Sequence, residues 1–233
     1  MPTIVVTGAS QGIGQAVAEA FAREPGARLA LVARSKEKLD AVAAQCRLHG
    51  AEASVFACDV TDDAAVHQTA QAVLAHWGAP DVLVNNAGLF QPGTVAETSA
   101  DLFRRQVAVN LTSAFVVTQA FLKPMIERRR GHLFFMASVA SIRAYEGGAA
   151  YCAAKHGLLG LARVVREETK ALGLRVTTLL PGATLTPSWD GVDLPEERFM
   201  PPEDIARTVL DIYHLSDRTV VEDILLRPQL GDI

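Results

Sequence analysis

The sequence predicts an α/β fold in which a doubly wound parallel sheet of about seven strands carries helices on both faces. The first observation is that short β-branched or aliphatic runs alternate with longer segments of helical apolar spacing. The second is that runs such as Leu29-Ala30-Leu31-Val32 are apolar throughout, which is typical of strands covered on both faces. Right-handed crossovers between such strands place a ligand beyond their carboxyl ends.

The expected elements alternate along the chain. Strands are expected at Thr3–Thr7, Arg28–Ala33, Ala53–Ala57, Val82–Asn85, His132–Ala137, Arg175–Leu180 and Val221–Leu226. Helices are expected at Gly12–Glu24, Ser35–His49, Asp62–Trp77, Ser99–Arg129, Ala150–Leu172 and Pro202–Leu215. No linker-like composition, internal repeat or low-complexity tract interrupts this order, so a single domain over residues 1–233 is expected.

The composition indicates a cytoplasmic protein. A net charge of −4, without a block of like charge, argues against nucleic acid or an anionic membrane as the main partner. No apolar run approaches the roughly 18–20 residues that span a bilayer, and the N-terminus shows no signal-peptide pattern. Cys46, Cys58 and Cys152 have neither metal-ligand spacing nor an even number for disulfides, so no metal is expected.

A glycine-rich turn follows the first strand and leads into the first helix. It reads Thr7-Gly8-Ala9-Ser10-Gln11-Gly12-Ile13-Gly14, which is the spacing Gly-x3-Gly-x-Gly. In a Rossmann-type site such glycines permit a tight turn, a close backbone approach to a pyrophosphate, and close packing of helix against strand. The helix N-terminus adds free N–H groups and a positive dipole end, so the pattern predicts a dinucleotide site.

Tyr151 and Lys155 stand one helical turn apart near the start of an expected helix. An i, i+4 pair shares one helix face, so the phenol and the ammonium project side by side. A nearby cation favours the phenolate and is expected to lower the pKa of Tyr151 toward a useful range for proton transfer.

Taken together, these motifs resemble the short-chain dehydrogenase/reductase family. The resemblance rests on Thr-Gly-x-x-x-Gly-x-Gly, on Asn85-Asn86-Ala87-Gly88, and on Ser138 thirteen residues before Tyr151-x-x-x-Lys155, and it extends to about Thr186. It implies hydride transfer between a nicotinamide cofactor and a ketone, an aldehyde or a secondary alcohol.

The resemblance also implies a role for each of four catalytic residues. Tyr151 would act as general acid in reduction and general base in oxidation, and Ser138 would bond the substrate oxygen. Lys155 would bond the nicotinamide ribose. Asn110 would hold a water that links Lys155 to solvent.

The residues that the resemblance places around the cofactor come from six segments. Asp59 and Val60 would contact adenine, Asn86 to Gly88 the adenine ribose, and Thr184 and Thr186 the carboxamide, while Asn85 would brace the sheet. The full set is Gly8, Ser10, Gln11, Gly12, Ile13, Gly14, Arg34, Asp59, Val60, Asn86, Ala87, Gly88, Tyr151, Lys155, Pro181, Gly182, Thr184 and Thr186.

The end of the second strand favours NADP(H) over NAD(H). An acidic residue there would hydrogen-bond the ribose 2′-hydroxyl of NAD, but the sequence has Arg34, which suits a 2′-phosphate. Many NADP-preferring relatives also carry a basic residue where this chain has Gln11.

Substrate choice is expected in the loops Leu89–Thr98, Val139–Gly148 and Pro187–Pro201. Trp189, Phe199 and Met200 are expected to form apolar walls there, and Tyr145 and Arg143 are further candidates. The family resemblance implies a homodimer or homotetramer. Two alternatives to a carbonyl reductase or alcohol dehydrogenase stay open: a 3-oxoacyl-[acyl-carrier-protein] reductase, which the atypical C-terminal sequence disfavours, and a catalytically silent NADP-sensing protein.

Overall fold

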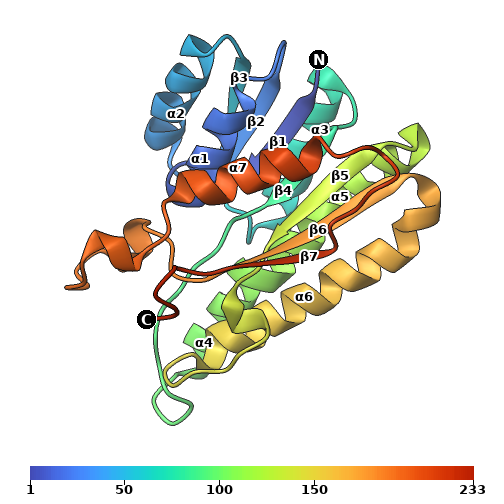
Figure 1. Cartoon of the computed structure of the whole chain (residues 1–233). Helices are drawn as coiled ribbons and strands as arrows, with labels where there is room; N and C mark the ends of the chain where they lie inside the picture. The colour runs from blue at the N-terminus through green and yellow to red at the C-terminus, as the bar shows by residue number, and fades with distance from the viewer.

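A seven-stranded, wholly parallel sheet forms the centre of the structure, a computed structural model that describes residues 1–233 (Figure 1). The strand order is β3-β2-β1-β4-β5-β6-β7. The strands are β1 (Thr3–Thr7), β2 (Arg28–Ala33), β3 (Glu52–Ala57), β4 (Val82–Asn85), β5 (Gly131–Met136), β6 (Leu174–Pro181) and β7 (Asp223–Leu226). This arrangement confirms the predicted fold class.

Helices cover both faces of the sheet. One layer contains α1 (Gly12–Phe21), α2 (Lys36–Leu48) and α7 (Pro202–Tyr213), and the other contains α3 (Asp63–Trp77), α5 (Ser113–Arg128) and α6 (Ala149–Thr169). The side chains of alternate residues on β1 pack against opposite layers: Ile4 and Val6 pack with the first layer, whereas Val5 packs with the second. Both faces are therefore buried, and the continuous apolar runs of the strands follow from that.

The path of the chain reverses between β1 and β4. From β1 it moves outward through β2 to β3, then returns to place β4 on the other side of β1. The helices after β1 and β4 thus leave on opposite sides, and a crevice opens at the carboxyl ends of these two strands.

A π-helix interrupts the predicted continuous helix Ser99–Arg129. The structure has α4 (Ala100–Val107), then a π-helix over Ala108–Thr112, and then α5; the N–H of Ser113 reaches back five residues to the carbonyl of Ala108. Asn110, at the centre of the π-helix, is buried and donates its side-chain amide to the carbonyl of Gln106 (2.9 Å). Such a bond competes with the regular helical ladder, which gives a physical reason for the interruption.

Other element boundaries differ from the predictions by only a few residues. The helix after the glycine turn ends at Phe21 rather than Glu24, and the last strand begins at Asp223 rather than Val221. None of the helices combines the length and the apolar composition needed to cross a lipid bilayer.

We expect Asn110→Ala to lower the free energy of unfolding by about 2–4 kcal/mol. The reason is that the side-chain amide of Asn110 joins the π-helix to the loop after β4. That amide donates to the Leu89 carbonyl (2.7 Å) and accepts from the Leu89 N–H (3.1 Å). The control is Ser113→Ala, which loses one side-chain bond to the Val109 carbonyl (2.6 Å). Urea unfolding measures both variants. Equal losses of unfolding free energy would show that the amide stabilises the protein no more than one side-chain hydrogen bond does, which would contradict this prediction.

Candidate active site

A cleft of about 730 Å³ opens at the carboxyl edge of the sheet. The glycine turn, the loop after β4, the end of β5, the start of α6 and the segment after β6 form its walls. The predicted site residues that line it are Gln11, Gly12, Ile13, Asn86, Gly88, Asn110, Ser138, Tyr151, Lys155, Pro181, Gly182, Thr184 and Thr186. The predicted residues outside this lining are Gly8, Ser10, Gly14 and Ala87, in the adjoining turns, and Arg34, Asp59 and Val60, after β2 and β3.

The glycine turn has the geometry of an anion cradle. Gly8 has φ of +67°, in the left-handed region, and a Cβ on Gly14 would lie 2.3 Å from the Gly8 carbonyl oxygen. The N-cap residue of α1, Gln11, makes no side-chain hydrogen bond to the first helical turn. The N–H groups of that turn therefore have no side-chain cap, and they fit the pyrophosphate of a dinucleotide.

Asn86 ties this turn to the end of β4. Its side-chain amide donates to the carbonyls of Thr7 (2.9 Å) and Gly8 (3.3 Å), and its backbone N–H donates to the Thr7 hydroxyl (3.0 Å). Asn85 braces the sheet as expected, because its amide donates to the hydroxyl of Thr118 on α5 (2.9 Å). The side chains of the Asn-Asn pair thus hold the walls of the cleft in place.

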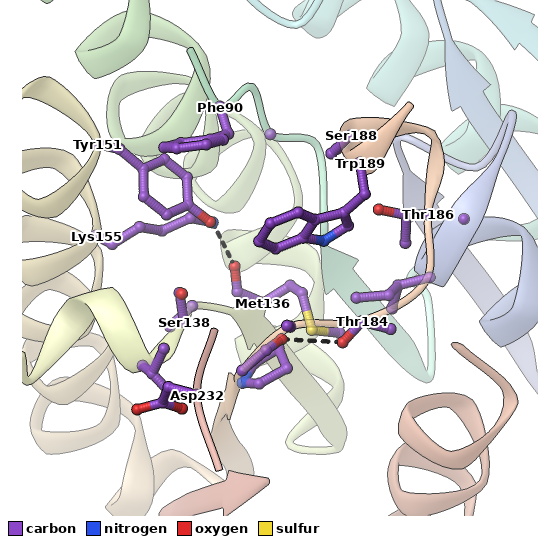
Figure 2. A pocket seen from close by; sticks show the side chains of 18 of the residues that line it. Phe90, Met136, Ser138, Tyr151, Lys155, Thr184, Thr186, Ser188, Trp189 and Asp232 are labelled. Atoms are coloured by element: carbon purple, nitrogen blue, oxygen red, sulfur yellow. Dashed lines mark hydrogen bonds between the residues drawn. The ribbon is translucent and has the colours of Figure 1, made fainter. Parts of the chain in front are cut away.

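Tyr151 and Lys155 lie on one face of α6 and meet Ser138 at the end of β5 (Figure 2). The Lys155 Nζ lies 5.6 Å from the centroid of the Tyr151 ring and donates to the Met136 carbonyl (2.7 Å). The Ser138 hydroxyl faces the same cleft as the phenol and accepts from the N–H of Ala140 (3.1 Å). A phenol, a hydroxyl and a buried ammonium therefore converge where a substrate oxygen could bind.

The pKa values at this centre are governed by burial. Burial raises the pKa of Tyr151 to about 12, although the neighbouring Ser138 hydroxyl opposes the rise. Burial lowers the pKa of Lys155 to about 8. Removal from water therefore sets the direction of the Tyr151 pKa shift among the protein's own groups, opposite to the lowering expected from a neighbouring cation.

Asn110 reaches the same cleft from the π-helix. Its side-chain oxygen lies beside Gly88, where an added Cβ would be 3.1 Å from that oxygen and 3.8 Å from the Lys155 Nζ. Both N–H groups of its amide already bond carbonyls, so the oxygen is its remaining site for a water.

Arg34 and Asp59 stand after the neighbouring strands β2 and β3, outside the lining of the cleft, where the adenosine of a dinucleotide is expected. Arg34 is exposed and makes no hydrogen bond or ion pair. The Asp59 carboxylate accepts from the N–H (2.9 Å) and the hydroxyl (2.7 Å) of Thr61; these bonds lower its pKa, and Arg34 adds to the effect. Lys38, which the sequence reasoning missed, donates to the side chain of Gln11 (2.8 Å) and brings a second cation here.

The segment after β6 closes the cleft opposite the catalytic residues. Thr184 pairs with Met200 in an isolated β-bridge, and its hydroxyl donates to the Gly182 carbonyl (3.1 Å). Thr186 lies against the glycine turn, where a Cβ on Gly12 would be 3.1 Å from its methyl group. The two predicted cofactor segments thus face each other.

The prediction that Phe199 and Met200 form walls of the cleft is wrong, whereas Trp189 does line it. Phe199 packs under Trp189, with ring centroids 5.1 Å apart, and Met200 belongs to the core beneath α7. Both side chains are buried because the Thr184–Met200 bridge turns this stretch back onto the sheet.

The segment after β7 supplies a wall that the sequence gave no reason to expect. Leu230, Gly231, Asp232 and Ile233 line the cleft. The Asp232 carboxylate pairs with Arg143 from the loop before α6 (2.8 Å) and with Arg227 (3.4 Å). No spacing in the sequence signals such a contact, because the partners are 89 residues apart.

The comparison with known proteins points the same way as the geometry. A family model described as short chain dehydrogenase matches residues 2–196. Sepiapterin reductase from Chlorobaculum tepidum is 36% identical over 239 residues, which cover 99% of this chain and 97% of that protein. D-threitol dehydrogenase from Mycolicibacterium smegmatis is 38% identical over 213 residues, which cover 87% of this chain and 82% of that protein.

Among solved structures, an alcohol dehydrogenase from the archaeon Thermococcus sibiricus, complexed with 5-hydroxy-NADP, is similar over the whole chain. Its TM-score is 0.92 at 32% identity, with 100% of this chain and 99% of that chain covered. The names of these relatives differ in substrate, so the similarity identifies a family and no single substrate.

The lowered pKa of Lys155 predicts how stability changes with pH. Between about pH 8 and pH 10.4 the unfolded chain keeps a proton on this lysine that the folded protein has lost, so the folded protein gains stability as the pH rises. We expect the unfolding free energy of the wild type to rise by about 2 kcal/mol relative to Lys155→Met between pH 7 and pH 9.5.

Urea unfolding at several pH values measures this difference. Both proteins carry Tyr151, so the titration of its phenol cancels in the difference between them. A difference that stayed constant with pH would mean that burial does not lower the pKa of Lys155.

Proposed function

Because the chain belongs to the short-chain dehydrogenase family, we propose that it is an NADP(H)-dependent oxidoreductase that interconverts a ketone or aldehyde and a secondary alcohol. The observation that carries the proposal is the convergence of Tyr151, Ser138 and Lys155 in a cleft that also contains the uncapped N-terminus of α1. The proposal takes residues 1–233 as one catalytic domain.

The cofactor supplies the hydride when it is bound, so the protein's own residues must bind, orient and handle the proton. The glycine turn would hold the pyrophosphate, and Asn86 to Gly88 would lie along the adenine ribose. Lys155 would bond the nicotinamide ribose, while Thr184 and Thr186 would fix the carboxamide.

Tyr151 is the proposed proton donor in the reducing direction. Its raised pKa keeps the phenol protonated at neutral pH, so a proton is available for the carbonyl oxygen. The Ser138 hydroxyl would donate a hydrogen bond to the same oxygen as negative charge develops. Lys155, with a pKa of about 8, keeps a positive charge near the phenol at neutral pH and would stabilise the phenolate that remains. A water on Asn110 would return the proton.

The preference for NADP(H) rests on Arg34. Its guanidinium has no partner within the chain, β2 ends without a carboxylate, and Lys38 adds a cation nearby. A guanidinium suits a phosphate through paired hydrogen bonds. The Thermococcus sibiricus enzyme, whose structure holds 5-hydroxy-NADP, agrees with this assignment.

Self-association into a homodimer or homotetramer is part of the proposal. Phe115 on α5 and Val164 on α6 are 48% and 52% exposed, so each of these helices offers apolar surface that a second copy of the chain would cover. Leu158 and Val165 on α6 are buried within the chain and would not take part in such a contact.

We expect Tyr151→Phe to lower kcat/KM for NADPH-dependent carbonyl reduction by roughly 10²–10⁴-fold, because it removes the proton donor. The affinity for NADPH, measured by calorimetry, should change by less than about threefold. Tyr213→Phe is the matched control, since this tyrosine packs against Phe21 on α1, away from the cleft. NADPH binding without turnover in the wild type would instead favour the sensing protein.

Arg34→Ala is expected to lower kcat/KM for NADPH by roughly 10–100-fold and to leave that for NADH nearly unchanged. Lys36→Ala controls for general charge, because Lys36 is exposed and already pairs with Asp40 (2.6 Å). An equal loss with both nucleotides would remove Arg34 from the 2′-phosphate site.

A further inference from the structure

Four aromatic side chains from four separate segments line the catalytic end of the cleft. Phe90 comes from the loop after β4, Tyr145 from the loop before α6, Tyr151 from α6, and Trp189 from the segment after β6. Only Tyr145 and Tyr151, on either side of the start of α6, are close to each other in sequence.

Phe90 and the two tyrosines form a fixed group. The Phe90 ring meets Tyr151 edge to face, with centroids 5.1 Å apart and planes at 71°, and meets Tyr145 at 6.5 Å and 62°. Edge-to-face contacts of this kind hold the rings in defined orientations. The Phe90 ring is therefore positioned directly beside the catalytic phenol.

Trp189 faces this group across the cleft. Figure 2 shows its indole projecting into the cavity from the side opposite Tyr151. The side chain is supported from behind by Phe199, at 5.1 Å and 61°, and its backbone N–H donates to the Thr186 carbonyl (3.0 Å). The indole is thus a supported wall of the cleft, with its backbone tied to the base of the segment.

The rest of this end of the cleft combines apolar surface with an ion pair. Val139, Leu230 and Ile233 add apolar surface. Arg143 and Asp232 both line the cleft and pair with each other (2.8 Å), and Asp232 also pairs with Arg227 (3.4 Å). A sugar or polyol would bury hydroxyl groups against these walls without replacing their bonds to water.

The geometry points to ketones whose carbonyl is attached directly to an aromatic or heteroaromatic ring as the substrates of this site. The ring lies between Trp189 and Phe90, and the carbonyl oxygen reaches Ser138 and Tyr151. This assignment rests on the proposed reductase function. It separates this chain from relatives named for sugar alcohols, such as the D-threitol dehydrogenase.

Two ketones of similar size test the assignment: acetophenone and cyclohexyl methyl ketone, which differ in whether the ring is aromatic. With NADPH as reductant, the wild type should show kcat/KM at least about tenfold higher for acetophenone. Trp189→Leu should bring this ratio close to one, whereas Trp189→Phe should keep most of it. Leu230→Ala is the matched control, because loss of a plain apolar wall should lower both values alike.

Fluorescence gives a second readout that needs no turnover. The chain has two tryptophans, Trp77 on α3 and Trp189, so Trp77→Phe leaves Trp189 as the reporter. Acetophenone should quench it saturably, and much more strongly than cyclohexyl methyl ketone does. The variant Trp189→Phe keeps only Trp77, which lies outside the cleft, so it measures how much of the quenching is collisional and does not depend on binding. If Trp189→Leu does not fold, Phe90→Leu tests the facing wall.

The outcomes separate this assignment from the proposed function. Turnover of the hydroxylated ketone erythrulose or of cyclohexyl methyl ketone as fast as acetophenone would overturn the aromatic assignment and leave the reductase standing. An acetophenone preference unchanged by Trp189→Leu and by Phe90→Leu would also overturn it. Saturable quenching by acetophenone without turnover of any ketone would support the aromatic walls and contradict the reductase.

Discussion

The rest of the structure depends on the hydrogen bonds that join β1 to β4 where the strand order reverses. Thr7 and Asn86 connect the two strand ends through side chain and backbone, and Asn86 also holds the carbonyl of Gly8. The cradle after β1 and the residues after β4, β5 and β6 belong to different halves of the sheet. These bonds hold the two strand ends together, so both halves of the sheet face the same cleft. A substitution at Thr7 or Asn86 should therefore disturb cofactor binding and substrate binding together.

The reacting centre is maintained against an unfavourable electrostatic environment. Burial acts on both members of the pair, since it raises the pKa of Tyr151 and lowers that of Lys155. The bond from Lys155 to the Met136 carbonyl compensates part of the cost of the buried ammonium. Perturbed groups that converge in a cleft are a common sign of a functional site, and here they coincide with the helix N-terminus expected to hold an anion.

Features set by local sequence were predictable, and those set by tertiary contacts were not. The strands, the glycine turn and the shared face of Tyr151 and Lys155 follow from spacing along the chain, and the structure has them at the expected positions. The contact that ties the π-helix to the loop after β4 is a bond from Asn110 to Leu89, 21 residues away. The direction of the Tyr151 pKa shift depends on burial, which no local pattern contains. The burial of Met200 in the core and the wall formed by residues 230–233 also depend on tertiary contacts, so the sequence did not predict them.

The most direct test of the account is the fate of a labelled hydride. Wild-type protein would be incubated with NADPH carrying deuterium at the transferable position of C4 and with acetophenone in ordinary water, and the alcohol would be analysed by mass spectrometry. Hydride transfer in this cleft predicts one deuterium on the carbinol carbon and none on the oxygen, because the carbon receives the deuteride from NADPH and the oxygen receives a proton from Tyr151. Alcohol without deuterium on that carbon would contradict hydride transfer in this cleft.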